Sequence, residues 1–134
     1  MRYALLIADA ETARPSPEPP DPEVWAQVMG DYNAYTQMLK DRGAYLGGEA
    51  LQPVTTATTV RIQDGERITT DGPFMEAKEA IGGFYLVEAR DLDEALEFAA
   101  ACPGARFGAI EVRPIMELPG DESAAAAREA MARG

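Results

Sequence analysis

The sequence contains no histidine, one cysteine and two serines among its 134 residues. Without histidine, Ser-His and Cys-His nucleophilic mechanisms and histidine-ligated metal centres are excluded. Ser16 lies in a proline-rich stretch and Ser123 in an alanine-rich tail, and neither segment would orient a nucleophile. Any acid-base chemistry must therefore use Asp, Glu, Lys, Tyr or Arg side chains.

The presence of only one cysteine also bears on the cellular compartment and on the metal sites that the chain could form. Cys102 cannot form an internal disulfide or a thiolate-rich metal site, so nothing implies an oxidising compartment. It follows a predicted helix, whose C-terminal dipole disfavours a thiolate, and we expect it to be inert. No loop has the regular acidic spacing of a calcium or magnesium site. We therefore expect neither a metal nor a cofactor.

Basic residues are scarce: 12 Lys and Arg stand against 23 Asp and Glu, for a net charge of −11. Such a charge repels phosphate backbones and anionic membranes, which argues against nucleic acid or a membrane as a direct partner. The first apolar run ends at Ala8, too short for a signal-peptide core or a membrane span. We expect a cytoplasmic protein with one domain, residues 1–118, and an alanine-rich tail, residues 119–134, that is at best a marginal helix.

The first half of the chain predicts a strand, a loop and a helix. Residues 3–8 form a continuous apolar run, typical of a strand at the centre of a sheet. Residues 9–21 contain four prolines and predict an extended loop. Asp21-Pro22-Glu23 is a strong helix start, and the helix is expected over residues 22–42. Helical spacing is followed by the apolar and aromatic residues Val24, Val28, Tyr32, Tyr35 and Leu39.

The second half predicts three strands, a hairpin and a helix. Asp64-Gly65 is a type I′ turn signal between two strands, and Asp91 begins a capping box with Glu94. The expected elements are an edge strand within 44–51, a hairpin over 55–62 and 67–70, a strand over 82–89, a helix to residue 101 and a strand over 109–114. The predicted buried stripe of this second helix is Leu92, Ala95, Leu96 and Ala99.

This element order predicts an α+β protein with a ferredoxin-like split βαβ arrangement and an inserted β-hairpin. Two helices cover only one face of the sheet. The other face would expose apolar side chains, and we expect a second copy of the chain to bury it, giving a homodimer.

The most specific segment is residues 71–88, which combines a turn, a cluster of charges, a glycine pair and an apolar strand. Gly72-Pro73 fixes a backbone turn, and Asp71 can accept hydrogen bonds from the amides of that turn. Gly82-Gly83 would allow another backbone or a ligand to approach closely. The segment is therefore either a structural corner or the rim of a pocket.

Asp71 is the best candidate for a catalytic carboxylate. Apolar neighbours such as Phe74 could partly desolvate it and favour its protonated form, although an Asx-turn role is an equally good interpretation. Glu76 and Glu79 with Lys78 could form a mixed-charge pocket lip, or simply a solvated surface.

Three further residues are candidates for binding. Glu49 follows two glycines and Arg61 lies in the predicted hairpin, so the two could clamp a ligand or form a structural ion pair. Tyr85 is the aromatic residue that we expect to reach a cavity, whereas Tyr32, Tyr35 and Phe84 are expected mainly in the core.

These motifs make the sequence resemble the YCII-related, DGPF-domain family over about residues 1–118. The matching segments are Asp71-Gly72-Pro73-Phe74, Glu76, Lys78-Glu79, 82–86, 1–7, Gly48-Glu49 with Leu51 and Pro53, 59–61, 91–95 and 111–114. The resemblance implies a dimeric α+β barrel, with a cleft between sheet and hairpin and a mostly unassigned activity. Relatives in the wider superfamily carry a His-Asp pair, of which only an aspartate, Asp71, would be represented. The resemblance also implies an association with sigma-factor systems.

Two functions remain open at this point. The first is a non-catalytic dimeric module that binds a small molecule or a regulatory protein, consistent with the missing histidine and the strong acidity. The alternative is a cofactor-independent enzyme of isomerase, lyase or hydrolase type that uses Asp71 with Glu76 or Lys78 as general acid-base groups. If the acidic surface docks on a basic segment of a sigma factor, that association should depend on salt.

Overall fold

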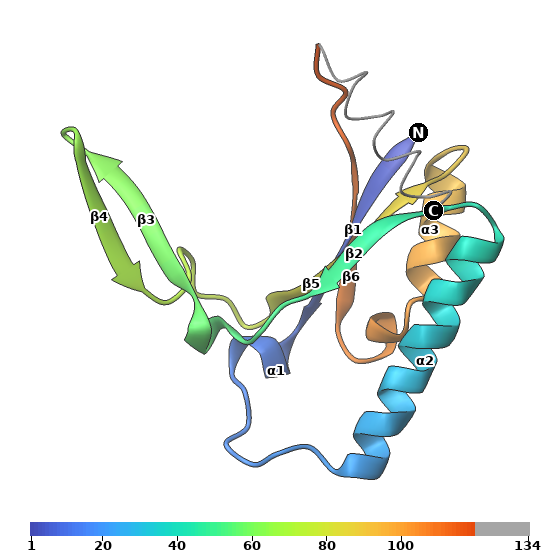
Figure 1. Ribbon diagram of the computed structural model, residues 1–134, viewed down its shortest axis with the longest axis horizontal. Coiled ribbons are helices and arrows are strands. Elements are labelled where there is room, and N and C mark those ends of the chain that lie inside the picture. The colour runs from blue at the N-terminus through green and yellow to red at the C-terminus, as the bar shows by residue number, and fades with distance from the viewer. Residues whose placement is uncertain (120–134) are drawn as a thin grey trace.

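The computed structural model describes residues 1–119 and contains one antiparallel sheet, two long helices and a separate hairpin (Figure 1). In chain order the elements are β1 (Arg2–Asp9), α1 (Ala10–Ala13), α2 (Pro22–Asp41), β2 (Tyr45–Ala50), η1 (Val54–Thr56), β3 (Thr58–Gln63), β4 (Glu66–Asp71), β5 (Ala80–Glu88), α3 (Leu92–Ala101), η2 (Pro103–Arg106) and β6 (Ala109–Pro114).

The main sheet has the strand order β2-β5-β1-β6, with every neighbouring pair antiparallel. Setting aside the hairpin β3–β4, this is the strand order of two interlocked βαβ halves. The prediction of an α+β, ferredoxin-like fold with an inserted hairpin is confirmed. β1 is a central strand and β2 lies at the edge, as the sequence predicted.

One face of the sheet forms the core. Alternate residues of β1, Tyr3, Leu5 and Ile7, are buried there beneath α2 and α3. Leu39 of α2 and Phe98 of α3 are fully enclosed in the same cluster. The two helices are also joined directly, because the Tyr35 hydroxyl donates a 2.6 Å hydrogen bond to the Phe98 carbonyl oxygen.

The helix starts lie where the sequence placed them. Asp21 accepts hydrogen bonds from the amides of Glu23 and Val24, and Pro22 occupies the first helical position. Asp91 accepts a 3.0 Å bond from the Glu94 amide at the start of α3. Local capping chemistry was therefore enough to predict both starts.

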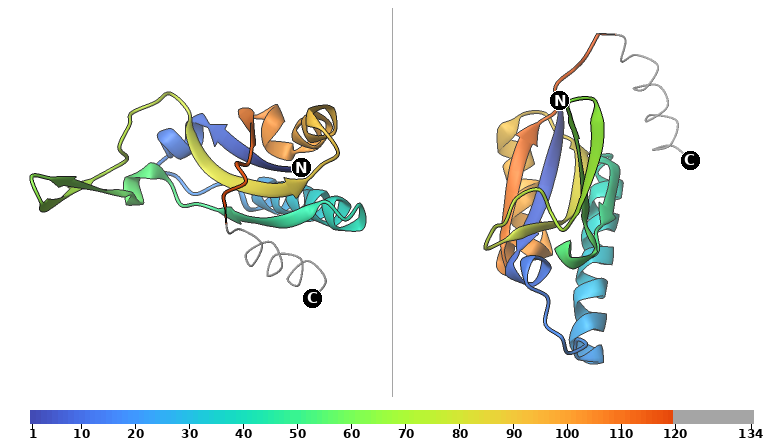
Figure 2. Two further views of the ribbon diagram at one scale, coloured as in Figure 1. Left: turned by 90° about the horizontal axis from the view of Figure 1, so that it is seen from above. Right: turned by 90° about the vertical axis from the view of Figure 1, so that its left-hand side faces the viewer.

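The predicted buried stripe of the second helix was partly wrong, and the residues at helical spacing in the first helix do not all reach the core. Val24 is 59% exposed, because the N-terminal end of α2 extends past the edge of the sheet (Figure 2). On α3, Leu92 and Leu96 are exposed and Phe98 is buried, because the helix turns Ala95, Phe98 and Ala99 toward the sheet. Apolar spacing identified two helices but not the face that each presents to the core.

The loop expected over residues 9–21 also contains a short helix. Asp9 ends β1 and its carboxylate accepts a 2.7 Å hydrogen bond from the Thr12 amide, which starts the single turn of α1. The proline-rich part follows this turn. The helix considered for the tail after Pro119 lies outside the described residues.

The second face of the sheet is not covered by any helix among residues 1–119. Its centre consists of two adjacent cross-strand pairs of β1 and β5, Ala4 with Leu86 and Leu6 with Phe84. All four side chains are partly exposed. We call this surface, with the flanking residues of β2 and β6, the open face.

The hairpin β3–β4 projects away from the main body as a two-stranded arm (Figures 1 and 2). Its turn residues Asp64 and Gly65 have φ values of 49° and 78°, as a type I′ turn requires. All its strand residues except Thr59 are exposed. Among the helices of the described residues, none is long and apolar enough to cross a membrane.

A substitution at Gly108 tests how tightly β6 packs against the end of β1. A Cβ atom at this position would collide with the carbonyl oxygen of Ala8. We expect Gly108→Ala to lower the free energy of unfolding by about 1–3 kcal/mol, measured by urea denaturation. The matched variant Gly30→Ala adds a methyl group where nothing lies within 4 Å and should stabilise the helix by about 0.5–1 kcal/mol. Equal effects of the two changes would refute this packing.

Candidate functional site

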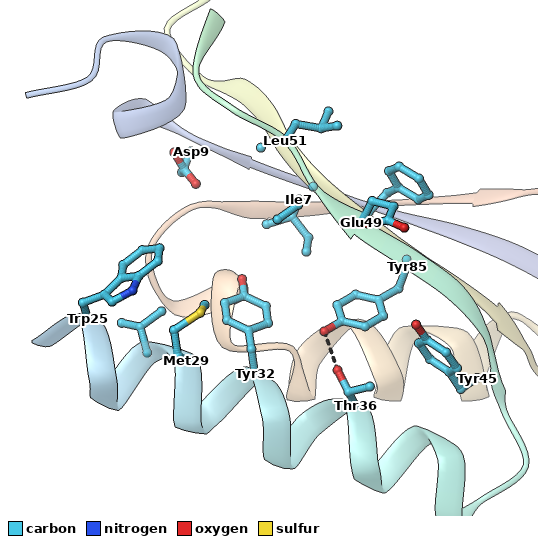
Figure 3. Close-up of a pocket in the computed structure, with 16 residues that line it drawn as sticks. Ile7, Asp9, Trp25, Met29, Tyr32, Thr36, Tyr45, Glu49, Leu51 and Tyr85 are labelled. Atoms are coloured by element: carbon cyan, nitrogen blue, oxygen red, sulfur yellow. Dashed lines mark hydrogen bonds between the residues drawn. The ribbon is translucent and has the colours of Figure 1, made fainter. Parts of the chain in front are cut away.

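A cavity of about 410 Å³ lies between α2 and the sheet (Figure 3). It exists because α2 is anchored to the core only through its C-terminal half, where Tyr35 and Leu39 are buried. The N-terminal half, which carries Trp25 and Met29, stands away from the strands and forms one wall. Trp25, the only tryptophan, is 53% exposed at this wall.

The opposite wall comes from the helix-facing side of the sheet and includes Ile7, Gly83 and Tyr85. Glycines keep the strand backbones close together here: a Cβ on Gly83 would lie 3.0 Å from the Glu49 carbonyl oxygen, and one on Gly48 would lie 2.7 Å from the Phe84 carbonyl oxygen. Larger residues at either position would push β2 and β5 apart. The glycines therefore fix the shape of this wall.

Two hydroxyl groups form a polar bridge from the sheet to the helix. The oxygens of Tyr85 and Thr36 lie 2.8 Å apart, and either can donate the hydrogen bond (Figure 3). Burial raises the pKa of Tyr85, and the Thr36 hydrogen bond opposes that shift. The Tyr85 hydroxyl therefore stays protonated at neutral pH.

Tyr32, between Met29 and Thr36 on α2, brings a third hydroxyl to the cavity lining. Burial raises the pKa of Tyr32, with a further contribution from the neighbouring Cys102 thiol. A Cβ atom on Gly104 would lie 2.7 Å from the Tyr32 oxygen and 2.7 Å from a methyl group of Ile7, so this glycine leaves the room that Tyr32 occupies. The phenol is held neutral and can donate or accept a hydrogen bond.

Asp9 is the carboxylate at the end of the cavity nearest Trp25 (Figure 3). One of its oxygens accepts the Thr12 amide hydrogen bond that caps α1. Among residues 1–119, no lysine or arginine lines the cavity. The site therefore combines aromatic and aliphatic walls with neutral hydroxyls and negative charge.

The sequence-predicted site residues are not gathered in one place. Tyr85 lines the cavity as expected. Glu49 also lines it, but pairs with Phe84 across the strands, which places its side chain on the open face rather than beside Tyr85. Asp71 and Arg61 lie on the exposed hairpin, at the end of β4 and in the middle of β3. No ion pair between Glu49 and Arg61 occurs within residues 1–119.

The charged residues after Asp71 lie elsewhere again. Glu76 lines a second pocket, of about 300 Å³, together with Arg14 and Pro73. Lys78 and Glu79 are exposed on the segment that leads into β5. Phe74 is 73% exposed, so it does not shield Asp71 from solvent in the single chain.

Sequence reasoning missed the helical side of the site. Trp25, Met29, Tyr32 and Thr36 lie in a row along α2 and point toward the sheet (Figure 3). Their spacing of four, three and four residues is itself helical, and could have been recognised as a second stripe beside the core stripe. Asp9 was also missed, because its position at the end of an apolar strand suggested only a loop. No group of three or more Cys, Asp or Glu side chains that could hold a metal ion occurs in the described part of the chain.

Comparison with known proteins identifies the family. The model of the YCII-related domain matches residues 1–119. The chain belongs to the YCII-related family. An uncharacterised protein of Rhizobium meliloti (strain 1021) is 37% identical over 124 residues, covering 90% of this chain and 98% of the relative. The resemblance inferred from the sequence motifs is thus confirmed.

A solved structure gives a more distant similarity. It is the 5-chloro-2-hydroxyhydroquinone dehydrochlorinase of Burkholderia phenoliruptrix AC1100 in complex with 2,5-dihydroxybenzoquinone. The sequence identity is 20%, the TM-score is 0.47, and the match covers 88% of this chain and 96% of the other.

The raised pKa values of buried groups around the cavity predict a loss of stability in alkali. Burial raises the pKa of the Cys102 thiol and of the Tyr85 phenol. In an unfolded chain such groups lose their protons near about pH 8.5 and 10. The folded state retains these protons to higher pH, so its stability is complete below those values and falls as the pH rises above them.

We therefore expect the free energy of unfolding in urea to decrease from about pH 8.5 upward. In Cys102→Ala the decline should begin at higher pH, where the tyrosines titrate. A free energy that stays constant or rises between pH 8 and 10.5 would contradict the burial of these groups.

Proposed function

We propose that this YCII-related protein is a binding module for a compact, largely apolar small molecule that is neutral or positively charged. The observation that carries the proposal is the cavity between α2 and the sheet. Its volume of about 410 Å³ falls within the range of small-molecule sites. Apolar walls with a few polar groups are the usual composition of such sites.

The charge of the site supports the stated ligand class. A carboxylate or phosphate ligand would lie beside Asp9, and the lining that the described part of the chain provides holds no lysine or arginine to bind it. The net charge of −11 adds long-range repulsion. A neutral ligand can use the hydroxyls of Tyr32 and Tyr85, and a positively charged group can also interact with Asp9 and with the Trp25 ring.

Binding is favoured over catalysis by the groups that meet in the cavity. The Tyr85 and Thr36 hydroxyls are both neutral and hydrogen-bond each other. Asp71, the candidate for an enzymatic reaction, lines neither of the two cavities described above. A regulatory partner such as a sigma factor, which the family resemblance implies, stays a prediction; docking on the acidic surface would weaken as salt is added.

Three probes of similar size and different charge test the ligand class: benzylamine, benzyl alcohol and benzoate. We expect benzylamine and benzyl alcohol to raise the melting temperature and to change Trp25 fluorescence, and benzoate to have no effect. Binding only of benzoate would contradict the stated ligand class, and a lack of response to all three would count against the cavity as a site for molecules of this size.

Two aspartate variants locate the binding. Asp9→Asn should weaken the binding of benzylamine by roughly tenfold while changing that of benzyl alcohol little, because only the amine interacts with the carboxylate charge. Asp71→Asn is the matched control, and we expect it to leave both affinities unchanged in the same fluorescence titrations. A loss of binding in Asp71→Asn alone would move the site to the hairpin.

A further inference from the structure

The turn at residues 71–74 is fixed in place although it lies outside the main sheet. Gly72 has a φ of 99°, a conformation that favours glycine. Its amide donates a 2.8 Å hydrogen bond to the Ala57 carbonyl oxygen, and its own carbonyl oxygen accepts a 2.7 Å hydrogen bond from the Thr59 hydroxyl. The turn is therefore tied to the start of β3, and the segment that follows it leaves from a defined position.

The short helix α1 lies at the other end of this segment. Asp9 pairs with Ala80 at the start of β5, so the turn of α1 that follows Asp9 lies beside the point where the segment enters the sheet. A Cβ atom on Gly82 would collide with the Thr12 hydroxyl, and this glycine therefore allows α1 to approach β5. The amide of Arg14 closes α1 with a 2.8 Å hydrogen bond, which places Arg14 at the end of the helix.

The second pocket, of about 300 Å³, lies between α1, η1 and the segment that follows the turn. Val54, Pro73 and Met75 contribute apolar side chains to its lining. Its two charged groups are Arg14 and Glu76. The volume is at the small end of the range for ligand sites. The pocket therefore has room for a compact molecule and offers it one charge of each sign.

The two charges of this pocket are not paired with each other or with another group. Both side chains are exposed, and within residues 1–119 neither Arg14 nor Glu76 forms an ion pair or a side-chain hydrogen bond. A ligand with a single charge would match one of these groups and lie beside the like charge of the other. A zwitterion matches both, because a guanidinium binds a carboxylate through two parallel hydrogen bonds and a carboxylate accepts hydrogen bonds from an ammonium group.

The overall charge of the chain also favours a zwitterion. The net charge of −11 repels an anionic ligand at long range. A zwitterion carries no net charge, so it can bring a carboxylate to Arg14 without that repulsion. The apolar part of such a molecule would contact Val54 and Met75, which line the same pocket.

We propose that the second pocket binds an α-amino acid with an apolar side chain. Its carboxylate lies against the Arg14 guanidinium and its ammonium group against the Glu76 carboxylate. Among the described residues, this pocket shares no lining residue with the cavity between α2 and the sheet, so the proposal does not rest on the ligand class of that cavity. The turn at residues 71–74 then forms the rim of a pocket and is more than a structural corner.

Amide chemical shifts in nuclear magnetic resonance titrations test the proposal, because they measure weak binding at an exposed site and also locate it. The probes are L-leucine, 4-methylpentanoate, which lacks the amino group, and 3-methylbutylamine, which lacks the carboxylate. We expect L-leucine to shift the amides of residues 13–14 and 75–77 and to bind about fivefold or more tightly than either analogue. Binding of the amine between α2 and the sheet would instead shift residues 25–36.

Two matched pairs of variants separate the charges of the pocket from charge elsewhere on the surface. Arg14→Gln and Glu76→Gln should each weaken L-leucine binding by about fivefold or more, because each leaves one end of the zwitterion without its partner. Arg61→Gln and Glu79→Gln remove the same charges from exposed positions outside the pocket lining and should leave the affinity within about twofold. All four side chains are exposed, so each variant should retain the native circular dichroism spectrum.

The absence of shifts with L-leucine, or shifts confined to residues 25–36, would overturn the proposal. Equal affinities for L-leucine and its two analogues would also overturn it, as would an equal loss of binding in Arg14→Gln and Arg61→Gln or in Glu76→Gln and Glu79→Gln. None of these results bears on the cavity between α2 and the sheet, because ligand binding there is measured by Trp25 fluorescence and by the Asp9→Asn variant.

Discussion

The architecture depends on the way in which α2 is attached to the sheet. Only its C-terminal half is buried, where Leu39 enters the core and the Tyr35 hydroxyl bonds to the Phe98 carbonyl of α3. Helix α2 has 20 residues and is longer than the part of the sheet on which it can pack. Its first turns therefore extend beyond the strands. The cavity, its aromatic wall and the exposure of Trp25 all follow from that excess length.

The alternation of side chains along β1 divides the sheet into two chemically distinct faces. Tyr3, Leu5 and Ile7 form the core and the inner wall of the cavity, whereas Ala4 and Leu6 point to the open face. One strand therefore contributes to the cavity on one side of the sheet and to the open face on the other. The two faces meet at the edge of the sheet, where Glu49 and Phe84 border the cavity as well as the open face.

Local signals in the sequence predicted most of the fold, because caps and turns depend on neighbouring residues. Asp21 and Asp91 marked helix starts, and Asp64-Gly65 marked the hairpin. The site was harder to predict, because it depends on how far α2 stands from the sheet, a tertiary property that no local pattern contains. The turn at Asp71 is the most specific local motif, yet Asp71 lies on the exposed hairpin, whereas Asp9, at the end of β1, lines the cavity.

Hydrogen exchange along α2 tests the central claim that this helix is anchored at one end and lines a ligand cavity at the other. In the free protein, amides of residues 26–31 should exchange faster than those of residues 35–40, because the first group lies on the part of the helix that does not pack on the core. Saturation with benzylamine should slow the first group and leave the second unchanged. Equal protection of both halves in the free protein, or no response of residues 26–31 to a probe that binds, would contradict the account.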